Sequence, residues 1–113
     1  MKIIKEKISL AELKKIAEEM FGDLVKAVVD VEKGIMAVGG ELHSDEEAVL
    51  IKDGSKPENL WGISIYPEVE GEGWIEFDSV INIRPSQGNR SRGIDNPEIR
   101  KKVIEIVQNL VER

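Results

Sequence analysis

Residues 24–38 read LVKAVVDVEKGIMAV, and this stretch does most to decide the fold. Its first part, Leu24 to Glu32, is rich in β-branched residues and predicts a strand with Val25, Ala27, Val29 and Val31 on one face. Lys33-Gly34 then predicts a tight hairpin turn, and Ile35 to Leu42 returns as the partner strand. The pair Gly39-Gly40 near the end of that strand indicates a bulge or a close backbone approach.

Outward from this hairpin, the remaining elements alternate between strands and helices. Further strands are predicted at Lys2 to Ile8, Leu60 to Tyr66 and Trp74 to Ile83, and helices after Ser9, after Ser44 and after Asp95 or Asn96. The segments Ser9-Leu10-Ala11-Glu12 and Ser44-Asp45-Glu46-Glu47 are capping boxes, and Pro97 fits a first helical turn. A strand at residues 47–52 is the alternative to the second helix.

The resulting order is β-α-β-β-α-β-β-α. It predicts an α+β fold, with a mixed or largely antiparallel sheet and helices packed on one face. The 113 residues fit a single domain, 1–113.

Composition excludes several classes of protein. No apolar run approaches the roughly 20 residues of a membrane span, and the first residues lack the apolar stretch of a signal peptide. With no cysteine there is no disulfide and no thiolate metal site. We therefore expect a cytoplasmic protein with no membrane contact, no bound metal and no cofactor.

The charge is unevenly spread. Residues 41–80 contain eleven acidic residues against Lys52 and Lys56, within a chain of net charge −6. Such a surface repels long polyanions, so nucleic acid is an unlikely partner. RNA binding through the later arginines, with Trp61 or Trp74 as a stacking platform, is the weakest alternative.

Arginine is absent before Arg84 and then concentrated. Residues 83–93 read IRPSQGNRSRG and contain no acid. Guanidinium groups suit carboxylate and phosphate, so this arginine loop predicts a site for a small anionic molecule. Arg84, Arg90 and Arg92 would clamp the anion, and Ser86, Gln87 and Asn89 would orient it.

An alternative is that these arginines pair with acids. The acids belong either to the same chain or to another copy, which would make the chain a protein-interaction module or a homo-oligomer such as a homodimer.

His43 is the only histidine of the chain. In an extended segment it shares a side with Glu41, and the two predict a catalytic proton-transfer pair. The alternative is a structural histidine near a helix start. Glu76 and Asp78 share the polar face of the predicted strand that runs toward Arg84, and a solvated strand face is the favoured explanation for them. No nucleotide-binding or hydrolase motif is present, so whether the chain is an enzyme stays open.

Three segments carry a resemblance: GGELH at 39–43, LWGISIYP at 60–67, and the stretch from Trp74 that includes INIRPSQGNRS at 81–91. Together they look like a family of small uncharacterised prokaryotic proteins, over nearly the whole chain. The resemblance implies no activity and no residue roles.

Overall fold

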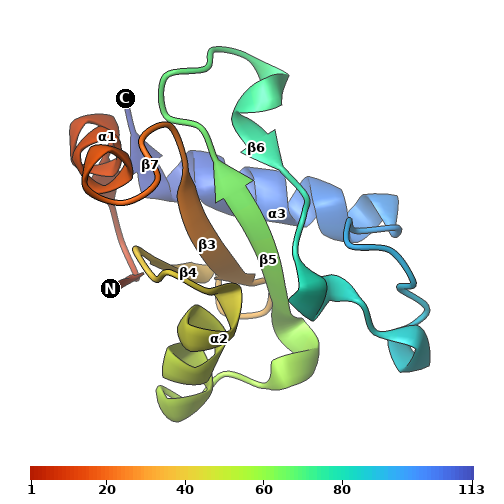
Figure 1. The fold of residues 1–113 in the computed structure, drawn as a ribbon. Coiled ribbons are helices and arrows are strands. Elements are labelled where there is room, and N and C mark those ends of the chain that lie inside the picture. Colours follow the sequence, from red (N-terminus) through yellow and green to blue (C-terminus); the bar gives the residue numbers. More distant parts are fainter.

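The computed structural model describes residues 1–113 and contains one five-stranded sheet. The strand order is β1-β4-β3-β5-β6, and every neighbouring pair is antiparallel. The strands are β1 (Lys2–Ile4), β3 (Val25–Asp30), β4 (Ile35–Val38), β5 (Leu60–Ile65) and β6 (Ile75–Glu76) (Figure 1). The α+β class and the largely antiparallel sheet are confirmed.

Two very short strands lie outside this sheet. They are β2 (Ile8–Ser9) and β7 (Val111–Glu112), which pair in parallel and bring together segments near the two ends of the chain. The predicted first strand at Lys2 to Ile8 is therefore divided between β1, which lies at an edge of the sheet, and β2.

Three α-helices complete the fold: α1 (Leu10–Glu19), α2 (His43–Lys52) and α3 (Pro97–Leu110). Two begin at the predicted caps. The Ser9 side chain accepts a hydrogen bond from the Glu12 amide, and Asn96 accepts one from the Glu98 amide. None of the three has the length and hydropathy that a bilayer crossing requires.

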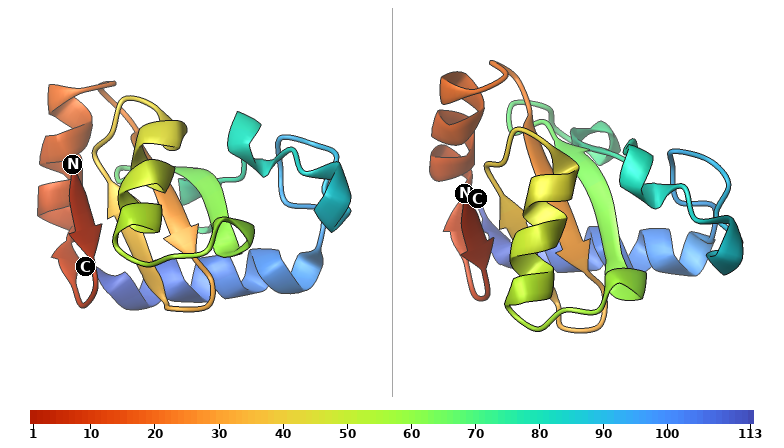
Figure 2. Two further views of the ribbon diagram at one scale, coloured as in Figure 1. Left: turned by 90° about the horizontal axis from the view of Figure 1, so that it is seen from below. Right: turned by 60° about the horizontal axis from the view of Figure 1, so that its bottom comes forward.

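The helices pack on both faces of the sheet, so the prediction of a single covered face is wrong. On one face, Ala27 and Val29 of β3 join a core of 20 buried residues that includes residues of α1 and α3. On the other face, Val28 packs with Leu50 of α2 in a core of five. Figure 2 shows α2 and α3 on opposite sides of the strands. Because β3 is central and covered on both sides, all of its residues except the half-buried Lys26 are buried.

The predicted strand from Trp74 to Ile83 is also wrong after Glu76. β6 ends there, and 3₁₀ turns follow at Val80–Asn82 and Pro85–Gln87. Ser79 accepts a hydrogen bond from the Ile81 amide and starts the first turn. Apolar and polar residues do alternate in this segment, but after Glu76 the backbone leaves the sheet, so the alternation there does not mark a strand.

Candidate functional site

Two buried asparagines hold the arginine loop against β5. The Asn82 side chain accepts a hydrogen bond from the Gly62 amide at 2.8 Å and donates to the Gly62 and Arg92 carbonyls, each at 2.9 Å. Asn89 donates to the carbonyls of Asn82 and Gly93 at 2.7 and 2.8 Å. Long irregular segments are uncommon in compact domains unless they have a function. This one is ordered by its own side chains.

Arg84 lies inside this network and does not face solvent. Its Nε donates to the Ile81 carbonyl at 3.0 Å, and its Nη2 donates to the Leu60 carbonyl. The guanidinium is 4.7 Å from the centre of the Trp61 ring and 3.6 Å from a Glu47 carboxylate oxygen. Burial lowers the pKa of Arg84, and Glu47 opposes that shift. Arg84 therefore connects β5, α2 and the loop.

The other predicted ligand-binding residues are dispersed. Arg92 pairs with Asp78 at 2.6 Å, with both side chains near half exposed. Arg90 is exposed and has no ionic partner. Asn89 is buried, whereas Ser86 and Gln87 are exposed, and Gln87 donates to the Glu58 carbonyl. The six residues thus do not converge on one point.

His43 is the first residue of α2, so the predicted extended conformation at this position is wrong. Its Nε2 donates to the Ile63 carbonyl at 2.7 Å. This bond places the ring proton of the neutral imidazole on Nε2 and leaves Nδ1 as an acceptor. Burial lowers the pKa of His43, which favours the neutral ring. His43 thus lies at a helix start and forms a hydrogen bond there, which is the arrangement that the structural alternative described.

Glu41 does not form the predicted pair. Its side chain is exposed, it precedes the helix, and no hydrogen bond joins it to His43. Its carbonyl instead accepts a hydrogen bond from the Lys26 ammonium at 3.0 Å. Lys26 is therefore anchored beside the start of α2, a position that the sequence did not indicate.

The predicted capping box at residues 44–47 does not form either. Leu42 occupies the N-cap position, and no side chain accepts a hydrogen bond from the first turn of α2. Glu46, which lies inside the predicted box, is fully buried and accepts a hydrogen bond from the Gly40 amide at 3.0 Å. A Cβ at residue 40 would lie 2.7 Å from the Glu46 Cγ, so the predicted close approach at this glycine is confirmed.

Polar side chains collect on the α2 side of the sheet, next to His43. Lys26, Ser64 and Glu76 are cross-strand neighbours in β3, β5 and β6. Lys26, Asp78 and Arg92 are also near enough for their charges to act on the His43 ring. We call Lys26, His43, Ser64, Asp78 and Arg92 the His43 surface.

Gly62 makes this packing possible. A Cβ at residue 62 would lie 2.6 Å from the Ser79 Oγ and 3.2 Å from the His43 Cδ2. The glycine thus admits both side chains onto β5. The fold brings the predicted His43 and Arg92 near each other, along with Lys26 and Ser64.

The side chains of this surface are of the kinds that transfer protons and attract charged molecules. No group of three or more histidine, cysteine, aspartate or glutamate side chains is arranged to hold a metal ion. The surface contains one imidazole acceptor, two cations of which Arg92 is paired with Asp78, the buried Ser64 hydroxyl, and the open first turn of a helix.

No curated protein and no solved structure matches the chain. A family model described as "Protein of unknown function (DUF5674)" matches residues 2–110, nearly the full length. This agrees with the resemblance to a family without an assigned activity. The chain therefore belongs to the DUF5674 family of proteins of unknown function.

Proposed function

We propose that this domain binds a small anion, phosphate- or carboxylate-bearing, at the His43 surface. The observation that carries the proposal is the uncapped start of α2, which lies beside the Lys26 ammonium. The N-terminus of a helix presents unpaired amides and the positive end of the helix dipole, which together attract anions. Here that end stands next to a lysine and near an arginine.

Four residues of the surface have distinct roles in this proposal. Lys26 and Arg92 supply positive charge, and the amides at the start of α2 donate hydrogen bonds to the anion. Asp78 holds the Arg92 guanidinium at 2.6 Å and fixes its position. His43, neutral with Nδ1 as an acceptor, receives a hydrogen bond from a protonated ligand oxygen. If the domain is an enzyme, His43 is the group that takes the proton.

This proposal revises the arginine clamp inferred from the sequence. Arg92 is retained, but Arg84 and Asn89 are occupied by groups of their own chain. Arg90, Ser86 and Gln87 stay open to solvent. They are available at the rim of the loop, away from the interior position of Arg84.

The test is a titration of the ¹⁵N-labelled protein with inorganic phosphate and with glycerol phosphate. We expect the amide signals of His43 and Ser44 to move most. Arg92→Gln should weaken binding by about threefold to tenfold, the range for one exposed charge-assisted contact. Lys52→Gln is the matched control, since Lys52 is exposed at the opposite end of α2. Equal weakening by both variants would leave only a general charge effect and reject the site.

A second candidate function is self-association or protein binding through the arginine loop. Val80 and Ile83 are 63% and 44% exposed, and they belong to the same segment as the unpaired Arg90. Protein interfaces commonly combine exposed apolar residues with arginine. Light scattering of the wild type and of Val80→Ser at low and high salt tests this candidate. A monomer at every salt concentration removes the homodimer.

A further inference from the structure

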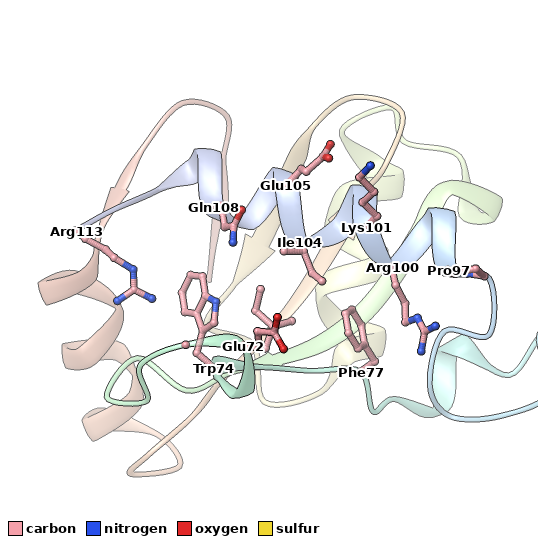
Figure 3. Close-up of a pocket in the computed structure, with 12 residues that line it drawn as sticks. Glu72, Trp74, Phe77, Pro97, Arg100, Lys101, Ile104, Glu105, Gln108 and Arg113 are labelled. Atoms are coloured by element: carbon pink, nitrogen blue, oxygen red, sulfur yellow. The ribbon is translucent and has the colours of Figure 1, made fainter.

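A groove lies on the α3 side of the sheet, beyond the edge strand β6. It has a volume of about 760 Å³ and lies between α3 and the segment from Gly71 to Phe77 (Figure 3). β6 ends the strand order, so no further strand covers this edge. The groove belongs to neither the arginine loop nor the His43 surface.

The floor of the groove is apolar and partly aromatic. Trp74 and Ile75 belong to the main core, and Phe77 and Ile104 pack against that core while remaining partly exposed. In Figure 3 Ile104 extends from α3 toward the segment that carries Trp74 and Phe77. A flat apolar group would therefore find aromatic and aliphatic contacts on this floor, beside the Glu72 carboxylate that lies between Trp74 and Phe77 in Figure 3.

The groove also contains charges that the protein leaves unpaired. Arg100 extends from α3 toward Phe77, whereas Lys101 and Glu105 extend the other way (Figure 3). The Arg113 guanidinium lies 4.4 Å from the centre of the Trp74 ring. None of the chain's four ion pairs includes a residue of the groove.

Asp95 does not form an ion pair with Arg100. The charge of Arg100 acts on Asp95, but that carboxylate already accepts hydrogen bonds from the Ser91 hydroxyl at 2.6 Å and the Arg90 amide at 3.1 Å. Arg100 therefore projects over the apolar floor without an ionic partner. Its fork of donors suits a carboxylate or a sulfonate.

We propose that this groove binds a small organic anion with a flat apolar body and one carboxylate-like group. The body lies on Phe77 and Ile104, and the anionic group meets Arg100. The volume falls in the usual range of about 300–1,000 Å³ for small-molecule sites. Arg113, stacked on Trp74, closes the other end. The site is independent of the phosphate proposal, because it lies on the opposite face and requires an apolar ligand.

Two fluorescent probes of matched shape test the proposal. 8-Anilinonaphthalene-1-sulfonate carries an aromatic body and a sulfonate, and N-phenyl-1-naphthylamine has the same body without the charge. We expect Arg100→Gln to weaken sulfonate binding about tenfold and to leave binding of the neutral probe unchanged. Lys102→Gln is the control, since Lys102 is exposed on the same helix but does not line the groove.

The two variants distinguish binding at Arg100 from general attraction to surface charge. Selective loss of sulfonate affinity in Arg100→Gln, with Lys102→Gln unchanged, supports the site. Equal loss in both variants shows attraction to surface charge alone and overturns it. Absence of sulfonate binding to the wild-type protein overturns it as well. Circular dichroism of both variants establishes that each is folded, which is expected because both side chains are exposed.

Discussion

Replacing Glu46 with glutamine is expected to stabilise the protein at neutral pH and to have little pH-independent effect. Glu46 is fully buried, and burial raises its pKa from the ordinary 4.5 to about 9. At pH 7 the folded protein therefore retains a proton that the unfolded chain has released. One of its carboxyl oxygens, Oε1, is buried without a hydrogen-bond partner.

The magnitude follows from linkage. Because the folded pKa lies above the unfolded one, the contribution of Glu46 is most favourable below pH 4.5 and is lost as the pH rises toward 9. From 4.5 to 7 is about 2.5 pH units, each worth about 1.4 kcal/mol, so keeping the carboxyl buried costs about 3 kcal/mol at pH 7. Glutamine is neutral at every pH, and its carbonyl can accept the Gly40 hydrogen bond.

Urea unfolding of the wild type and Glu46→Gln, followed by tryptophan fluorescence from about pH 4 to about pH 8, measures this difference. The stability gain of the variant should grow by about 3 kcal/mol between pH 4 and pH 7. Titrations common to both proteins cancel in the difference. Glu41→Gln, at an exposed position, is the control. A gain that stays flat with pH would show that Glu46 is ionised in the fold and would refute the reasoning.

Three further predictions concern the loop and the histidine. Asn82→Ala should lower the free energy of unfolding by about 3 kcal/mol in urea, because the buried Gly62 amide and carbonyl lose their partner; a loss below about 1 kcal/mol would mean that water replaces the side chain. The NMR titration midpoint of His43 should lie below 6.5, so protonation of the unfolded chain destabilises the fold as the pH falls below that value. A midpoint at or above 6.5 would contradict the burial argument. Arg84→Lys should cost about 2 kcal/mol in thermal unfolding, because lysine cannot both stack on the ring and reach two carbonyls; Arg90→Lys, at an exposed site, should cost nothing measurable.

The order of the elements was predictable because their signals are local. Ser9 and Asn96 cap helices with bonds to amides two or three residues away, and the sequence contains both partners. The side of the sheet on which α2 packs was not predictable. An apolar stripe on a helix shows that one face is buried, but it does not identify the sheet face that covers it.

The strand expected after Glu76 failed for a different reason. The alternation of apolar and polar residues predicts the strand correctly through β6. Beyond it, the Asn82 side chain forms hydrogen bonds with both the amide and the carbonyl of Gly62. One side-chain amide thus takes the place that a backbone ladder would have filled on β5. No local pattern distinguishes an asparagine that ends a sheet in this way from one on a polar strand face.

The sequence indicated which kinds of residue form the candidate site, but not how the fold arranges them. Arginine content alone indicated an anion site, and it pointed to Arg84 as strongly as to Arg92. What turns Arg84 inward is a set of distant groups, the Leu60 carbonyl and the Glu47 carboxylate, which only the fold brings together. Lys26 was hidden for the same reason, since its partner is a backbone carbonyl beyond the hairpin.

The parallel pair of β2 and β7 has a consequence for how the chain folds. Ile8 lies opposite Val111, so this contact closes a loop of nearly the whole chain. Loop closure on that scale carries a large entropic cost, which is met only after the intervening sheet and helices are in place. We therefore expect the β2–β7 pair to form last during folding and to open first. Amide hydrogen exchange in this pair should be faster than in β3 or β5.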